Sequence, residues 1–218
     1  MDSDDFDIEL AARPRLRGRL HQVTTFVAML GLVVLVENAA STEARIGAWV
    51  YGSASIALYA VSSGYHVFAR SPRLRAVMQR VDHTMIYVLI AGTFTPIALV
   101  TLHGTAQTVA LGVMWLGAAV GMVVKLAWFG RFRRLGSALY IVLGWAGLMA
   151  LPGLWSRWTV LALVIAGGLL YTVGAILFAL RRPRLKGRWF GYHEVWHVFG
   201  VGAGVLIFVA NLRLVQTT

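Results

Sequence analysis

The amino-acid sequence predicts an all-α integral membrane protein, a bundle of seven transmembrane helices with a cytoplasmic N-terminus and a C-terminus outside. Composition is the first observation behind this prediction. Of the 218 residues, 58% are apolar and only 13% are charged, and the mean hydropathy is +0.71. One soluble core of this size could not bury so much apolar length. The second observation is a series of apolar windows, and the third is the placement of the basic residues.

Seven windows of about 20 mostly apolar residues follow one another, which is the length that crosses a hydrocarbon core of about 30 Å. They are 22–40, 46–68, 82–102, 106–129, 135–154, 158–180 and 192–214. The segments between them are short, so we expect neighbouring helices to be antiparallel in one bundle. The first window lacks a convincing cleavage site and is interpreted as a retained helix. The chain therefore divides into a polar N-terminal tail, residues 1–21, and a seven-transmembrane domain, residues 22–218.

Lys and Arg residues gather on one side of such a bundle. Short basic segments are retained in the cytoplasm, so their positions predict orientation. In a seven-span protein, 17 basic residues fall on one side and three on the other. The first set is Arg13, Arg15, Arg17, Arg19, Arg70, Arg73, Arg75, Arg80, Lys125, Arg131, Arg133, Arg134, Arg181, Arg182, Arg184, Lys186 and Arg188, and the second is Arg45, Arg157 and Arg213. This split favours seven helices in the inner (plasma) membrane.

Charge and cysteine content exclude other classes. The formal charge of +11 does not indicate a nucleic-acid partner, because the basic residues sit in short runs between apolar spans. Cysteine is absent, so a disulfide framework and a thiolate metal site are both excluded. A metal ion would have to rely on His, Asp, Glu and water. The sequence does not indicate an oligomeric state.

Ionisable residues at membrane depth are functional candidates, because lipid makes them costly. The second window ends with His66, the third begins with Asp82 and His83, and the seventh carries His193 and His197. His193 and His197 are four residues apart and share one helix face. We expect these residues to meet near the cytoplasmic face. Three imidazoles suit a catalytic zinc ion, with Asp82 as a partner through water or as a general base, although an isolated histidine pair also serves ordinary hydrogen bonding.

With these residues the sequence resembles the haemolysin III family, bacterial relatives of the progestin and adiponectin receptors and of the alkaline ceramidases. The matching pieces are Ser62-x-x-x-His66, Asp82-His83, Ala91-Gly92-Thr93-Phe94-Thr95-Pro96, Gly144-Trp145, Gly168-Leu169-Leu170-Tyr171-Thr172-Val173-Gly174 and Tyr192-His193-x-x-x-His197. The resemblance implies that His66, His193 and His197 hold Zn²⁺ and that Asp82 contacts it through water. It places Ser62 close by and implies action on lipid amides.

Three functions remain open at this stage. The first is a zinc-dependent hydrolase that takes membrane lipids as substrate, with Asp82 as base and Ser62 stabilising the oxyanion or supporting the site. The second is a non-enzymatic lipid sensor or haemolysin in which zinc is structural and membrane lipids are ligands. The third is an intramembrane metalloprotease, because residues 193–197 also fit the pattern H-E-x-x-H, in which the glutamate is the base.

Neighbours of the candidate ligands receive supporting roles. His83 and Glu194 each follow a candidate residue by one position, which turns them about 100° around the helix. We assign both a role beside the ligands, and for Glu194 the turn could equally aim the side chain at the arginine-rich segment before the last window. His21 and His103 lie near window ends and are interpreted as interfacial. Pro96 removes a backbone donor inside the third window and predicts a bend.

Overall fold

The structure is a computed structural model that describes residues 14, 16–127, 133–185 and 189–217. Most of the predicted polar tail, residues 1–13 and 15, therefore lies outside the described residues. All regular structure in the described part is helical. The elements are α2 (Arg19–Glu37), α3 (Thr42–Phe68), α4 (Pro72–Thr101), α5 (Gly104–Ala127), α6 (Arg133–Ala146), the 3₁₀ turn η1 (Gly147–Ala150), α7 (Leu151–Leu154), α8 (Trp158–Ala179) and α9 (Tyr192–Val215).

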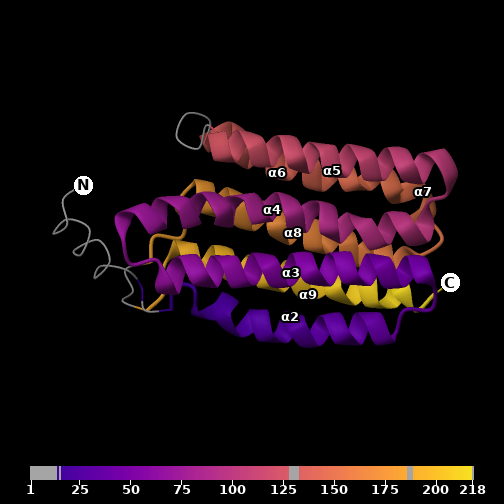
Figure 1. Ribbon diagram of the computed structural model, residues 1–218, viewed down its shortest axis with the longest axis horizontal. Coiled ribbons are helices and arrows are strands. Elements are labelled where there is room, and N and C mark those ends of the chain that lie inside the picture. The colour runs from indigo at the N-terminus through magenta and orange to yellow at the C-terminus, as the bar shows by residue number, and fades with distance from the viewer. Residues whose placement is uncertain (1–13, 15, 128–132, 186–188, 218) are drawn as a thin grey trace.

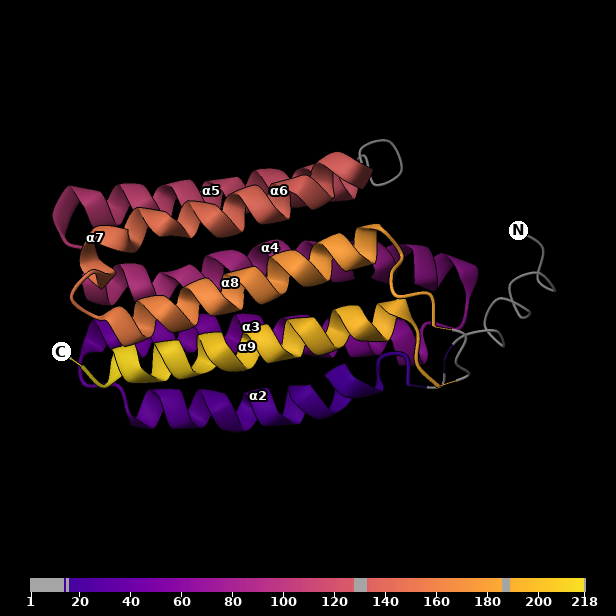
Figure 2. The same ribbon diagram turned by 180° about the vertical axis from the view of Figure 1, so that it is seen from behind.

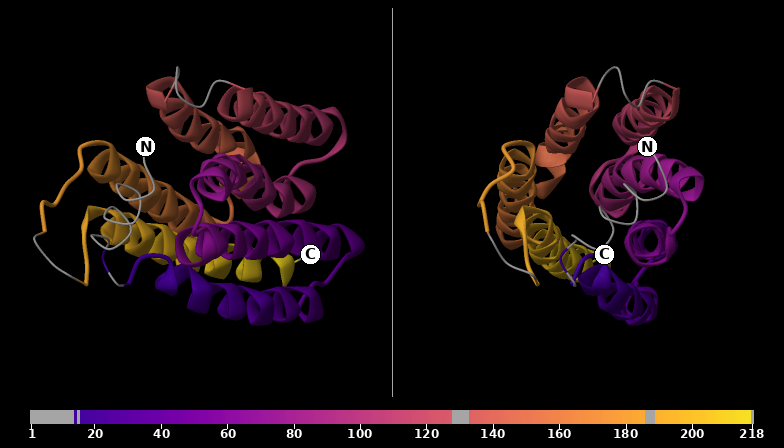
Figure 3. Two further views of the ribbon diagram at one scale, coloured as in Figure 1. Left: turned by 60° about the vertical axis from the view of Figure 1, so that its left-hand side comes forward. Right: turned by 90° about the vertical axis from the view of Figure 1, so that its left-hand side faces the viewer.

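These elements form seven rods in the described part of the chain, because α6, η1 and α7 follow one another without a break. Seen along the bundle, the rods form a ring in chain order (Figure 3). Each rod packs on the next, α8 packs closely on α9, and α9 returns to α2 and closes the ring. The described start of the chain and its C-terminal end lie at opposite ends of the bundle (Figures 1 and 2).

The outside of the bundle is apolar, as a protein surrounded by lipid requires. On α2, Phe26 and Leu30 are 64% and 69% exposed, and on α5 Leu116 is 70% exposed. Within the described ranges, five helices are long and apolar enough to cross a membrane: α2, α4, α5, α8 and α9. This confirms the all-helical class and the multi-pass character predicted from the composition. The crossing of seven helices and the orientation of the termini stay predictions.

The helix α3 falls outside this set of five although it is 27 residues long. Its hydropathy is low because it carries hydroxyl side chains along its buried side. Ser55, Ser62, Ser63, Tyr51 and Tyr59 are all buried there. Most hydroxyl side chains of α3 therefore face the interior of the bundle, and the candidate residue Ser62 is among them.

The helix α4 begins ten residues earlier than the third apolar window. The Ser71 hydroxyl accepts a hydrogen bond from the Leu74 amide at 3.3 Å, and Pro72 occupies the first turn. Both are favoured at helix starts. The apolar window missed this part because it contains Arg73, Arg75 and Arg80. The prediction that Asp82 opens this helix was therefore wrong, and Asp82 lies about 15 Å along it.

Candidate metal centre

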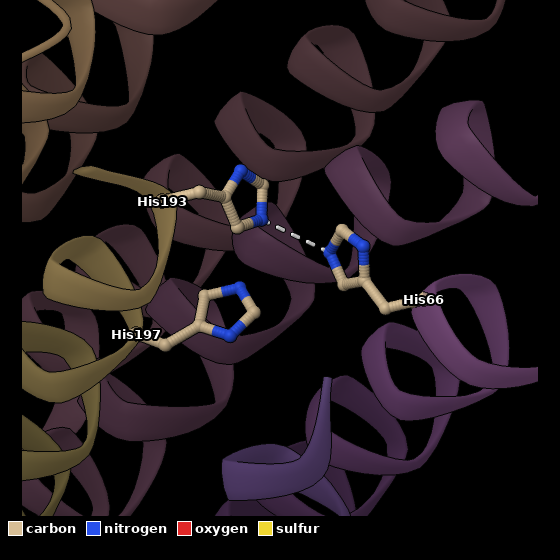
Figure 4. A group of neighbouring side chains, drawn as sticks. All are labelled: His66, His193 and His197. Carbon is tan, nitrogen blue, oxygen red and sulfur yellow. Dashed lines mark hydrogen bonds between the residues drawn. The ribbon is translucent and has the colours of Figure 1, made fainter. Parts of the chain in front are cut away.

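Two helix ends position the three candidate ligands. His66 lies in the last turn of α3, and His193 and His197 lie in the first two turns of α9. The start of α9 is well defined, because the Gly191 amide donates a hydrogen bond to Glu194 Oε2 at 2.8 Å. His193 and His197 share one face of α9, as predicted from their spacing. That face is turned toward the end of α3 (Figure 4).

The three imidazole rings converge on one point. The Nε2 atoms of His66 and His193 are 3.1 Å apart. Each of the three histidines offers one ring nitrogen, and these nitrogens lie within 4.8 Å of one another. His197 is buried and the other two are partly buried. Within the described residues, this is the group of His, Asp and Glu side chains able to hold a metal ion.

The donor set fits zinc. Zinc binds neutral imidazole at 2.0–2.1 Å in a tetrahedron, so two of its nitrogen ligands are separated by about 3.3 Å. The His66 to His193 distance of 3.1 Å is close to that value. Without a metal ion, one neutral imidazole of this pair would donate a hydrogen bond to the other, because each carries one N–H and one acceptor.

Asp82 stands beside this group rather than in it, since it is not among the three ligating residues. The Ser62 side chain lies close enough to the Asp82 carboxyl to influence its charge. Ser62 and His66 are four residues apart on α3 and share a face. Asp82 therefore lies beside the turn of α3 that precedes His66.

His83 points elsewhere than Asp82, as expected for consecutive helical residues. Its backbone carbonyl accepts a hydrogen bond from the Tyr140 hydroxyl at 2.9 Å, which ties α4 to α6. Its side chain is within electrostatic range of His193. His103 and Glu37 are exposed at the end of the bundle opposite the three histidines.

Comparison with known proteins now identifies the family. A family model described as "Haemolysin-III related" matches residues 11–208, which is most of the chain. The chain belongs to the haemolysin-III related family. Its similarity to "Hemolysin-3" of Bacillus cereus is 30% identity over 203 residues, covering 91% of this chain and 90% of that protein. This confirms the resemblance predicted from the ordered motifs.

Two further relatives of this haemolysin-III related chain show how widely the sequence is shared. The "Hemolysin-3 homolog" of Bacillus subtilis (strain 168) is 30% identical over 187 residues, which cover 85% of this chain and 84% of that protein. The "Heptahelical transmembrane protein ADIPOR2" of Oryza sativa subsp. japonica is 29% identical over 175 residues, with 69% and 74% covered. The relation to the adiponectin-receptor group is thus also supported.

In this haemolysin-III related protein, Glu194 has a partner that the sequence analysis did not name. Its Oε1 accepts from Arg17 Nε at 2.7 Å, and its Oε2 accepts from the Gly191 amide. Both carboxylate oxygens are therefore engaged, one with the N-terminal segment and one with the start of α9. The cation that holds Glu194 thus comes from the N-terminal segment of the chain.

His21 is a neighbour of the three candidate ligands that the sequence analysis missed. It was interpreted as interfacial, but it is only 6% exposed, and its ring stacks on His197 with centroids 3.9 Å apart. The first apolar window began at residue 22, just after it, whereas α2 begins at Arg19. A helix extended to residue 19 places His21 and Thr25 on one polar patch of an otherwise apolar helix, and that signal could have revealed it.

Proposed function

We propose that this protein is a seven-helix, zinc-dependent hydrolase of the inner (plasma) membrane that cleaves amide or ester bonds of membrane lipids. The observation that carries the proposal is the convergence of His66, His193 and His197, which come from two helices far apart in the sequence. Imidazoles gathered within reach of one ion, with a carboxyl group beside the neighbouring turn of α3, have the composition of a hydrolytic zinc site.

The membrane placement in this proposal has the N-terminus in the cytoplasm, the C-terminus outside and the zinc site near the cytoplasmic face. It is supported by the described basic residues, since Arg17, Arg70, Arg75 and Arg184 all lie at the histidine end of the bundle. The printed name of the rice relative, a heptahelical protein, agrees with seven crossings. The buried hydroxyl side chains of α3 face inward, so the low hydropathy of this helix is compatible with a membrane span.

The chain's own residues would divide the work as follows. His66, His193 and His197 hold the ion. A bound zinc ion supplies a Lewis acid that polarises a carbonyl group and activates water. Asp82 accepts the proton of the water molecule that attacks the carbonyl carbon, and returns it to the nitrogen or oxygen whose bond to that carbon breaks. The products are a fatty acid and an amine or alcohol.

Ser62 is assigned to Asp82 rather than to the substrate. The Ser62 side chain lies beside the Asp82 carboxyl, and a serine hydroxyl has a single proton to donate. A Ser62 hydroxyl that donates this proton to Asp82 cannot also donate it to an oxyanion. Of the two roles that the sequence analysis left open, we therefore favour the supporting one, in which Ser62 orients the general base.

A non-enzymatic protein is the second candidate, because one observation favours it. The helices α3 and α9 are not neighbours in the ring, and α2 packs against both of them. A metal ion held by His66 and the α9 histidines would fasten these two helices together, as structural zinc does. Such a protein would be a lipid sensor or a haemolysin, in keeping with the names of its Bacillus relatives.

The protease alternative receives less support. In the H-E-x-x-H arrangement the glutamate must be able to act on water beside the metal. Both oxygens of Glu194 are instead engaged by Arg17 and by the Gly191 amide. A role for Glu194 in holding the structure accounts for these contacts without assigning it any proton transfer.

The test is product analysis on purified protein with a known zinc content. Ceramide-like amides and phospholipid esters are incubated with wild type and with His66→Ala, and released fatty acid is measured by mass spectrometry. We expect zinc-dependent release from wild type alone. Zinc-loaded wild type that releases no fatty acid from any of these lipids would favour the structural or sensory role instead.

A further inference from the structure

Residues 16–21 run along the histidine end of the bundle and lead into α2. We call this segment the strap. It touches α9 and the end of α3, the two elements that carry the candidate ligands. Leu16 is tied to the segment before α9 by a hydrogen bond from its amide to the Trp189 carbonyl oxygen at 3.4 Å. Nothing in the proposed reaction uses the strap, so its contacts require a separate explanation.

The first contact is the ion pair between Arg17 and Glu194. Its nitrogen to oxygen distance is 2.7 Å, and the side chains are only 18% and 4% exposed. Glu194 lies between the two ligands of α9 in sequence and also accepts the amide hydrogen of Gly191. A charge buried this deeply needs its partner. Arg17 therefore holds the turn of α9 that carries His193.

The second contact is between Gly18 and His66. Gly18 has a φ of +79° and is buried against the end of α3. A Cβ added at this position would lie 2.5 Å from the Cβ of His66 and 3.2 Å from Val67 Cγ2. Glycine is required here for its backbone conformation and also because the chain passes directly over the ligand. The strap thus restricts where the His66 side chain can move.

The third contact is the stack of His21 on His197, with an interplanar angle of 11°. Together the three contacts reach His66 and His197 directly and His193 through the turn that bears it. We infer that residues 16–21 are a positioning strap, which holds the three ligand histidines at metal-binding distance and is locked by the Arg17 and Glu194 ion pair. This inference rests on the proposed metal site and assigns Glu194 to the lock.

The experiment uses the full chain in detergent or nanodiscs, with Zn²⁺ as the probe and chelator competition as the measure of affinity. Gly18→Ala is compared with Gly104→Ala, because Gly104 also has a positive φ, of +57°, but a Cβ there would meet nothing within 4 Å. We expect Gly18→Ala to lower zinc affinity roughly 10- to 100-fold, as is typical for residues that orient metal ligands. Gly104→Ala should match wild type.

A second pair of variants tests the lock. Arg17→Gln is compared with Arg19→Gln, because Arg19 is exposed and bonds only Gln22 among the described side chains. Arg17→Gln should lower zinc affinity about as much as Gly18→Ala, and Arg19→Gln should not. The double variant with Arg17→Gln and Glu194→Gln should bind zinc no more weakly than either single variant, because removal of one partner already breaks the pair. Arg17→Lys should restore part of the affinity.

Amide hydrogen exchange of residues 192–197 in metal-free protein gives a readout independent of zinc. Faster exchange in Arg17→Gln than in Arg19→Gln supports the strap. The strap is overturned if Gly18→Ala and Arg17→Gln both bind zinc with wild-type affinity. A loss of zinc affinity in only one of these variants supports the strap through that contact alone. If wild type itself binds no zinc, the proposed metal site fails, and unchanged exchange in Arg17→Gln then overturns the strap as well.

Discussion

The imidazole rings of His21 and His197 lie almost parallel, with centroids 3.9 Å apart and planes inclined by 11°. They come from the first and last helices of the ring, α2 and α9. His21 also meets the Tyr59 ring edge-on at 5.1 Å. The His21 ring thus covers one face of the His197 ring. This contact limits rotation of the His197 side chain away from His66 and His193.

Replacement of His21 tests this stack. Its Nδ1 atom is buried and has no hydrogen-bond partner among the described residues, so the flat ring rather than that nitrogen accounts for the contact. His21→Ala should weaken zinc binding roughly tenfold, whereas His21→Phe should stay close to wild type. Chelator competition measures both. An equal loss in His21→Phe would indicate that a ring nitrogen, and not stacking, is what the site needs.

Each ligand histidine should be needed for the metal. Purified wild type should hold about one zinc ion per chain, following the three-histidine ligand rule. His66→Ala, His193→Ala and His197→Ala should each reduce that content sharply, as measured by elemental analysis after dialysis. His103→Ala is the control, because His103 is exposed at the opposite end of the bundle.

One result in that series would be decisive against the cross-helix site. Full zinc content in His66→Ala would show that α9 binds the ion without α3. The two-histidine pattern of residues 193–197 would then be the binding unit, and the protease interpretation would regain support.

Substitutions of Asp82 and Glu194 should have separate effects on lipid hydrolysis and on zinc binding. Asp82→Asn removes the proposed base but leaves all three imidazoles, so it should retain most of its zinc and lose about 10²- to 10⁴-fold in lipid hydrolysis. Glu194→Gln should keep the activity per bound zinc and change only how tightly zinc is held. Turnover is normalised to metal content in each preparation. If zinc-loaded Glu194→Gln is inactive and Asp82→Asn is active, Glu194 is the general base and Asp82 is not.

Topology is tested by reporter fusions. The 17-to-3 distribution of basic residues predicts that reporters placed near Arg75, Arg133 and Arg184 are cytoplasmic and that one after Thr218 is outside. Alkaline phosphatase and green fluorescent protein fusions report the two sides with opposite signals. A cytoplasmic Thr218 would remove both the count of seven spans and the placement of the histidines at the inner face.

The sequence by itself determined the helical membrane class, because the length of the apolar windows and the placement of basic residues in every second connecting segment are properties of the linear chain. It also identified His66, Asp82, His193 and His197 as candidates, since ionisable side chains at membrane depth stand out against apolar surroundings. The spacing of His193 and His197 predicted their common face directly. Such features depend on local periodicity, which requires no knowledge of how helices pack.

Only the tertiary structure decided what lies beside those residues. Arg17 and Glu194 are 177 positions apart, and nothing in either local sequence predicts their pairing. The burial of His21 depends on how α2 packs against α9. The start of α4 at Pro72 could not be predicted from hydropathy, because arginines extend the helix beyond its apolar part. Long-range contacts follow from the closing of the ring, which is set by packing between faces rather than by hydropathy along the chain.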